Sequence, residues 1–153
     1  MAGRADVIAL SNLSAKMGYV AVSIAYRLNY NLFSTYSAER AIYRGLQDLS
    51  AAVRYLREHH SDYGIDYNNI FVWGSSAGAF SGVHLSYMEE EDRMESTFVN
   101  NWGWDPDLGC IDCSGNDFDH DRKPRAVIAC WGGILNLDWI NEGDGIPVTM
   151  FHG

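Results

Sequence analysis

A serine flanked by two glycines, in the segment 74–78, is the part of the sequence best suited to chemistry. The pentapeptide Gly-Ser-Ser-Ala-Gly places Gly74 and Gly78 two residues before and two residues after Ser76. The apolar run 69–73 precedes it and an amphipathic stretch follows, so a strand is expected to turn sharply into a helix at this serine. Such a turn projects the hydroxyl from the edge of a sheet, and small residues at the glycine positions relieve the crowding. Ser76 is therefore the candidate nucleophile.

The two neighbours of Ser76 have different expected roles. Ala77 begins the predicted helix, where unpaired N–H groups and the helix dipole favour developing negative charge. Its backbone N–H is the candidate donor of an oxyanion hole. Ser75 occupies the variable position of the motif and is expected to support the turn rather than react. The alternative for the pentapeptide is a glycine-rich turn without a catalytic role.

A serine nucleophile needs a base, and two histidines are kept as candidates. His152 follows an apolar run and is expected at the same sheet edge as Ser76, where active-site residues of α/β folds gather. His120 lies in a long loop that could reach over the sheet. His84 lies about 12 Å along the predicted helix from Ser76, which is too far for a hydrogen bond.

The elements that position Ser76 alternate between helices and strands. The clearest helix carries apolar residues at steps of three and four, namely Ile42, Leu46, Leu49, Val53 and Leu56. The predicted order is helix 4–17, strand 19–26, helix 38–60, strand 69–73, helix 77–90, loop 91–124, strand 125–131, helix 135–141 and strand 147–151. This alternation predicts a single α/β domain with a mostly parallel sheet of about four strands and helices on both faces.

The segment 91–124 is unusual because it is long, acidic and without a clear periodicity. A loop of this length is generally functional or mobile, and we expect a solvated, lid-like insertion. Its aspartates lack the twelve-residue spacing of a calcium loop, and no metal site is predicted. Cys110 and Cys113 either form a local disulfide or remain thiols, since a zinc site would need a second ligand pair and only His120 is near.

The overall charge limits the partners. The 153 residues include 11 basic and 20 acidic side chains, for a net charge of −9, which disfavours nucleic acid. No apolar run approaches the ~20 residues that span a bilayer. The location is left open, and a soluble, secreted or periplasmic full-length parent is one expectation.

Several segments resemble the carboxylesterases and hormone-sensitive-lipase-like enzymes of the α/β-hydrolase superfamily. The run 19–28 looks like the strand of that family that ends in Tyr-Arg-Leu. The segment 64–78 looks like its Gly-x-Asp … Ile … Gly-x-Ser-Ala-Gly pattern, and 147–153 looks like the strand that carries a His-Gly pair. In related enzymes an aspartate at the place of Asp48 supports the Tyr-Arg-Leu segment, which implies a contact with Arg27.

The resemblance implies a fold and an activity. It implies an eight-stranded, mostly parallel sheet and a triad of Ser, Asp or Glu, and His in that chain order. It also implies a second oxyanion donor from an upstream His-Gly-Gly loop. The reaction that it implies is hydrolysis of small-molecule carboxylic esters through an acyl-enzyme, with neither metal nor organic cofactor.

The family pattern extends past both ends of the 153 residues, so we expect a central fragment of a larger esterase that lacks the triad Asp and His. A natural mini-hydrolase is the alternative. Exposed sheet edges of a fragment would favour self-association. A non-catalytic α/β-hydrolase-like binding protein is the second function hypothesis. A peptidase or a dienelactone-type hydrolase is the third, although the latter often uses cysteine as nucleophile.

Overall fold

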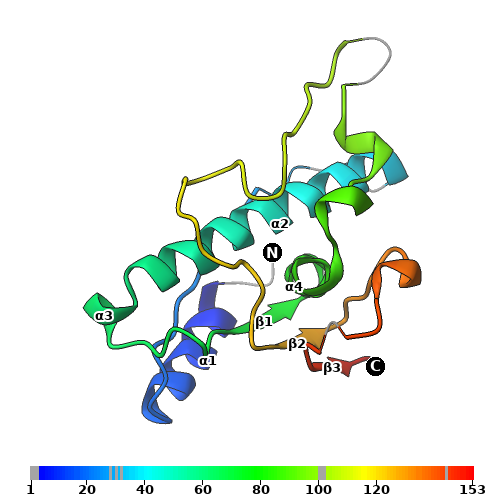
Figure 1. Ribbon diagram of the computed structural model, residues 1–153. Coiled ribbons are helices and arrows are strands. Elements are labelled where there is room, and N and C mark those ends of the chain that lie inside the picture. Colours follow the sequence, from blue (N-terminus) through cyan, green and yellow to red (C-terminus); the bar gives the residue numbers. More distant parts are fainter. Residues whose placement is uncertain (1–3, 28, 30, 32, 100–102, 144) are drawn as a thin grey trace.

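Helices and strands alternate along the chain of the computed structural model, which describes residues 4–27, 29, 31, 33–99, 103–143 and 145–153 (Figure 1). The helices are α1 (Arg4–Lys16), α2 (Thr35–Glu58), α3 (His60–Tyr63) and α4 (Ala77–Tyr87), and the strands are β1 (Phe71–Ser75), β2 (Ala126–Cys130) and β3 (Val148–Phe151). Short 3-10 turns are η1 (Glu90–Asp92), η2 (Glu95–Thr97) and η3 (Leu137–Trp139). The strands form one parallel sheet in the order β1-β2-β3, which confirms the predicted α/β class.

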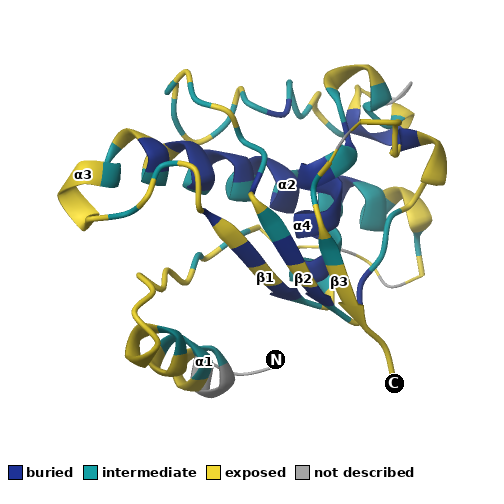
Figure 2. Cartoon of the chain, turned by 60° about the horizontal axis from the view of Figure 1, so that its bottom comes forward, coloured by how far each residue is buried: buried dark blue, intermediate teal, exposed yellow. Residues whose placement is uncertain are grey.

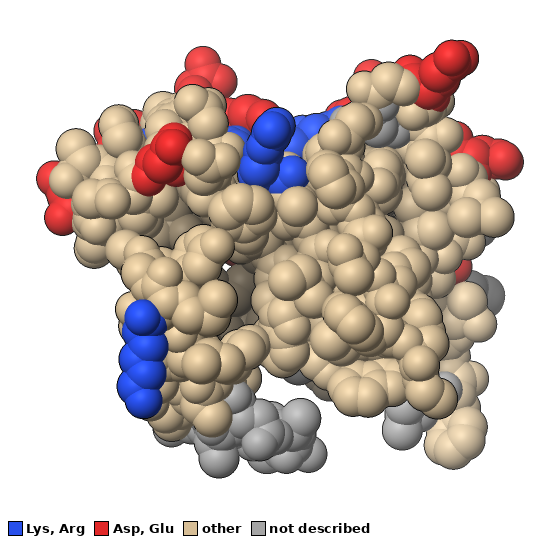
Figure 3. All heavy atoms as spheres, turned by 90° about the horizontal axis from the view of Figure 1, so that it is seen from below, with Lys and Arg blue, Asp and Glu red and all other residues tan. Residues whose placement is uncertain are grey.

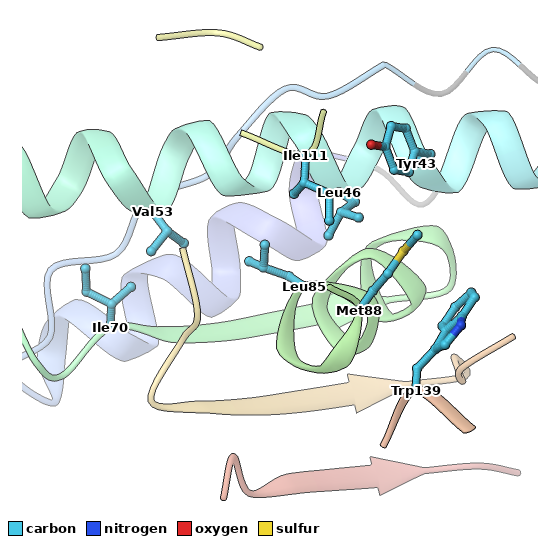
Figure 4. Packing of buried hydrophobic residues seen from close by; sticks show 8 residues of the cluster. All are labelled: Tyr43, Leu46, Val53, Ile70, Leu85, Met88, Ile111 and Trp139. Atoms are coloured by element: carbon cyan, nitrogen blue, oxygen red, sulfur yellow. The ribbon is translucent and has the colours of Figure 1, made fainter. Parts of the chain in front are cut away.

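One face of the sheet is covered by α4, and α2 packs on the outer side of α4 (Figure 2). Val72 and Val127 point to α4, where Gly82 allows a close approach: a Cβ on this glycine would lie 2.9 Å from a methyl carbon of Val72. A larger core fills the space between α2, α4 and the segments beside them (Figure 4). It contains Tyr43, Leu46, Val53, Ile70, Leu85, Met88, Ile111 and Trp139. The apolar stripe predicted for the long helix thus faces the core, as its spacing requires.

The other face of the sheet is open in the part of the chain that the structure describes. Phe71 and Trp73 of β1 and Ile128 of β2 are 50%, 42% and 42% exposed. Tyr19 contacts Phe71 edge to face, but the predicted helix layer over this face is not found. Seen from this side, the surface carries few charged side chains (Figure 3). Self-association through exposed sheet edges stays a prediction.

The predicted strand 19–26 is wrong, so the described sheet has three strands instead of about four. A strand needs a neighbour that pairs with its N–H and C=O groups, and residues 19–27 have no such ladder. The segment lies beside α2, where Val22 and Ile24 line an apolar pocket of about 270 Å³. Apolar residues on both faces predicted burial, but Val22 is about half exposed.

Arg27 and Asp48 hold the end of this segment on α2, as the family resemblance implied. The backbone N–H of Arg27 donates to Oδ2 of Asp48 at 2.8 Å, and its guanidinium donates to Oδ1 at 2.6 Å. Both side chains reach solvent, which limits the strength of the ion pair.

Replacing Asp48 with alanine is expected to lower the free energy of unfolding by about 1 kcal/mol, since a bidentate but solvent-screened pair is lost. Urea denaturation measures this, and proteolysis within residues 19–27 should become faster. Glu91→Ala is the control, because Glu91 is exposed and makes no ion pair with another described residue. Equal stability and equal proteolysis of the two variants would contradict the anchoring role.

The segment between α4 and β2 lies along α2 and is held there by its backbone (Figure 1). Arg40, Arg54 and Arg57 of α2 are at most 5% exposed, and each donates to several carbonyls. The acceptors in this segment are Ser96, Phe98 and Pro106 for Arg40, then Ser114, Asn116 and Phe118 for Arg54, and Asp121 and Lys123 for Arg57. Arg57 also donates to the carbonyl of Tyr67, which precedes β1. The expectation of a solvated loop overlooked these buried guanidinium groups. A lid role for the insertion stays a prediction.

Cys110 and Cys113 are joined by a disulfide within this segment, which decides between the alternatives that the sequence left open. Gln47 of α2 donates to the carbonyl of Cys110 at 2.9 Å, so the bridge also lies against the helix. None of the helices in the described ranges is long and apolar enough to cross a membrane.

Candidate active site

Ser76 lies at the turn between β1 and α4, in a backbone conformation that side chains rarely adopt. Its φ is 53° and its ψ is −120°, and its N–H donates to the carbonyl of Cys130 at 2.8 Å. A Cβ on Gly74 would lie 2.3 Å from the backbone carbonyl of Gly78, so only glycine fits at position 74. The strand, the sharp turn and the helix predicted from the pentapeptide are therefore present.

The hydroxyl of Ser76 does not cap α4. Ser76 is exposed and makes no side-chain hydrogen bond to the first turn of α4. Its carbonyl accepts instead from the N–H groups of Ala79 and Phe80 at 2.9 and 3.1 Å. The N–H of Ala77 belongs to the group that has no acceptor inside a helix, which suits the predicted oxyanion donor. Ser75 is half-buried and pairs in register with Cys130.

The structure does not bring either candidate base into contact with Ser76. Phe151, the last residue of β3, is in register with Cys130, which is in register with Ser75. His152 therefore lies at the same sheet edge as Ser76 but two strand spacings away, about 10 Å. Among the described residues, no histidine or carboxylate hydrogen-bonds to the hydroxyl of Ser76.

His120 lies near the other edge of the sheet. Its Nε2 is 2.7 Å from Oε2 of Glu58, and its Nδ1 is 3.2 Å from the hydroxyl of Tyr67. Tyr67 precedes β1, whereas Ser76 follows it, so the length of the strand separates His120 from the serine. The structure thus keeps His120 with Glu58 and Tyr67.

Two residues near Ser76 were not singled out in the sequence. The Tyr26 hydroxyl oxygen lies 3.4 Å from where a Cβ on Gly78 would stand, and burial raises the pKa of this phenol. Trp131 follows β2 at the same edge and has a φ of 54°. The available signals were the Tyr-Arg-Leu resemblance for Tyr26 and, for Trp131, the pair Gly132-Gly133 directly after an apolar run.

A metal site is not found in the described part of the chain, where no three His, Cys, Asp or Glu side chains are grouped to hold an ion. At the edge that carries Ser76, an exposed hydroxyl lies beside the N-terminus of α4, which is an arrangement suited to nucleophilic chemistry. The protein has a parallel sheet, and between a strand and a helix it has a serine with a positive φ. These two features place it in the α/β-hydrolase class.

Comparison with known proteins identifies the family. Residues 3–107 match the family model described as BD-FAE. Gut esterase 1 of Caenorhabditis briggsae is 33% identical over 126 residues, which cover 76% of this chain and 21% of the relative. Gut esterase 1 of Caenorhabditis elegans is 30% identical over 103 residues, which cover 61% and 18%. The chain thus spans about a fifth of the length of these curated relatives. No solved structure matches.

The family match covers more than half of the chain, so the protein belongs to the BD-FAE family, an esterase family of the α/β-hydrolase superfamily.

Proposed function

We propose that this chain is the core of a serine hydrolase that cleaves small-molecule carboxylic esters, with Ser76 as the nucleophile. The observation that carries the proposal is the backbone of Ser76, which is held at a positive φ between β1 and α4. Strained residues of this kind persist where the surrounding structure holds them, and they gather at functional sites. The esterase relatives favour an ester over an amide substrate.

The proposed reaction has two steps. The Ser76 hydroxyl oxygen attacks the ester carbonyl carbon while a base takes its proton, and the oxyanion is stabilised by the N–H of Ala77. The carbonyl re-forms, the alcohol leaves with the proton from the base, and an acyl-enzyme remains. A water molecule then attacks the acyl group, and the acid product leaves as Ser76 regains its proton.

The base and the acid are proposed to come from parts of the natural protein other than residues 1–153. His152 lies about 10 Å from Ser76 by strand spacing, and His120 is bonded to Glu58 and Tyr67. A histidine must reach about 3 Å from the hydroxyl oxygen to act as its base. We therefore assign neither histidine to the reaction.

A second function has one specific observation in its favour. The hydroxyl of Ser76 has no basic partner among the described residues, which is the arrangement expected of a non-catalytic α/β-hydrolase-like binding protein or of an inactive fragment. Such a protein would bind an ester or a related small molecule without turnover.

A fluorophosphonate probe distinguishes these two functions, because labelling requires an activated serine. The full-length polypeptide encoded by the gene should be labelled on the peptide that contains Ser76, as mass spectrometry of the digest would show. The isolated 153-residue chain should react much more slowly, since none of its described residues places a base beside the serine. A full-length protein that stays unlabelled, while a known serine esterase in the same mixture reacts, would favour the binding protein.

A further inference from the structure

Trp131 and Ser76 both have a positive φ, which is uncommon for residues other than glycine. In the described part of the chain these are the two non-glycine residues with a positive φ, 53° for Ser76 and 54° for Trp131. The left-handed region is unfavourable for a residue with a Cβ, and more so for a bulky one. Both residues follow a strand at the same edge of the sheet.

The surrounding backbone imposes this conformation on Trp131. Its N–H donates to the carbonyl of Phe151 at 2.9 Å, which extends the pairing of β2 with β3. The chain then turns at once toward α4, where a Cβ on Gly132 would lie 2.3 Å from the Cβ of Ala79. The chain after β2 therefore packs closely against the first helical turn of α4, which also contains the N–H of Ala77.

The side chain of Trp131 does not contribute to the core. The residue is 62% exposed, and its Nε1 lies 3.8 Å from the position of a Cβ on Gly153. The indole thus extends over the ends of β2 and β3. Glycine would adopt the same backbone without strain, so the turn itself does not require an indole.

The strand register sets the backbone of Trp131 beside that of Ser76. Ser75 is paired with Cys130, so Ser76 and Trp131 are the next residues of neighbouring strands, which lie about 5 Å apart. A substrate carbonyl that reaches Ser76 must bring its apolar substituents to this edge. The Trp131 backbone is fixed by its hydrogen bond to Phe151, and its exposed indole offers a large apolar surface that has few rotatable bonds to order on binding.

We propose that Trp131 determines specificity: its indole forms an apolar wall of the substrate site and favours esters that carry an aromatic or long alkyl group. This inference rests on the proposed hydrolase function. The preferred group can belong to the acyl part or to the alcohol part of the ester, and separate substrate series distinguish the two.

The test compares Trp131→Gly with the wild type in the full-length polypeptide. One series varies the acyl chain of p-nitrophenyl esters from acetyl to octanoyl, and the other varies the alcohol of acetyl esters from ethyl to naphthyl. In at least one series the variant should lose about tenfold or more in kcat/KM for the largest group, with a small change for the smallest. Trp131→Phe should retain most of the preference, because it keeps an aromatic ring.

Two controls separate specificity from folding. Leu137→Ala removes an apolar side chain that is 73% exposed, a few residues further along, and should leave both profiles unchanged. Trp131→Gly should melt no lower than the wild type, since glycine suits the positive φ. If the wild type is active and kcat/KM changes with substrate size in the same way in Trp131→Gly, the inference is overturned and the hydrolase function still holds. A wild type without labelling or turnover would overturn both.

Discussion

Ser76→Ala in the full-length polypeptide is expected to lower kcat/KM for short-chain aryl esters by about 10⁴-fold or more, because no acyl-enzyme can form. Release of p-nitrophenol from its acetate and butyrate measures this loss. The variant should fold normally: alanine keeps the Cβ of serine, so the strain at a φ of 53° is unchanged, and the hydroxyl caps no helix.

Two neighbouring variants make this prediction specific. Ser75→Ala should remain active and keep its fluorophosphonate labelling, since Ser75 is half-buried in β1 and paired in register with Cys130. Ser76→Gly should be as inactive as the alanine variant yet more stable by about 1 kcal/mol, because glycine adopts a positive φ freely. An active Ser76→Ala protein would exclude this serine as the nucleophile, and loss of activity in Ser75→Ala alone would assign the role to Ser75.

The geometry around Ser76 could be predicted from the sequence because it is local. Five consecutive residues impose the turn: the backbone of Gly78 leaves no space for a Cβ on Gly74, and the apolar run before them pairs as a strand. The surroundings of the hydroxyl could not be predicted in the same way. They depend on which strands neighbour β1, and spacing along the chain does not report that His152 follows a strand two positions away.

The fold could be predicted where the spacing of apolar residues indicates which side chains are buried. It could not be predicted where the structure of a segment depends on hydrogen-bond partners elsewhere in the chain. The apolar stripe of α2 indicated the core face, and Leu46 and Val53 are buried. The opposite side of α2 reads as a solvated polar face, although Arg54 donates to three backbone carbonyls there. Residues 19–26 are as apolar as a buried strand, yet the described residues provide no ladder partner for them.

The strain at Ser76 and at Trp131 has a common structural basis. The N–H of Ser76 donates to Cys130 and that of Trp131 to Phe151, so hydrogen bonds across the sheet continue to the point where both chains leave it. Gly74 and Gly132 then allow each chain to lie against the first turn of α4. Because α4 is held by β1, β2 and α2, its packing also determines the geometry of the edge. Damage to the buried side of α4 should therefore affect the site as well as stability.

His84 lies on that buried side of α4, and it should make stability depend on pH. Its Nδ1 is 2.7 Å from the carbonyl of Phe80, which can only accept, so Nδ1 carries the proton. The buried Nε2 has no partner among the described residues, and the ring of Trp139 lies 5.4 Å away, centroid to centroid. Burial lowers the pKa of His84 from 6.5 to about 4, against a smaller opposing effect of the hydrogen bond to Phe80.

The sign of the effect follows from which state binds more protons. Between pH 6.5 and about 4 the unfolded chain is protonated at this histidine and the folded protein is not, so stability falls as the pH falls through this window. The loss from His84 should reach about 3 kcal/mol near pH 4 and be absent above pH 7. Urea denaturation at pH 7.5, 6.0 and 5.0 would measure it.

His84→Leu is the decisive comparison, because leucine has no titratable group and binds no proton in either the folded or the unfolded state. Its free energy of unfolding should vary much less between pH 7.5 and 5.0 than that of the wild type, even if the two differ in stability at neutral pH. His59→Ala is the matched control: this histidine is partly exposed beside Asp62, and its removal should leave the wild-type dependence in place. A His84→Leu protein that loses stability in parallel with the wild type would show that other groups titrate in this window. The buried ring would then not be what links the packing of α4 to pH.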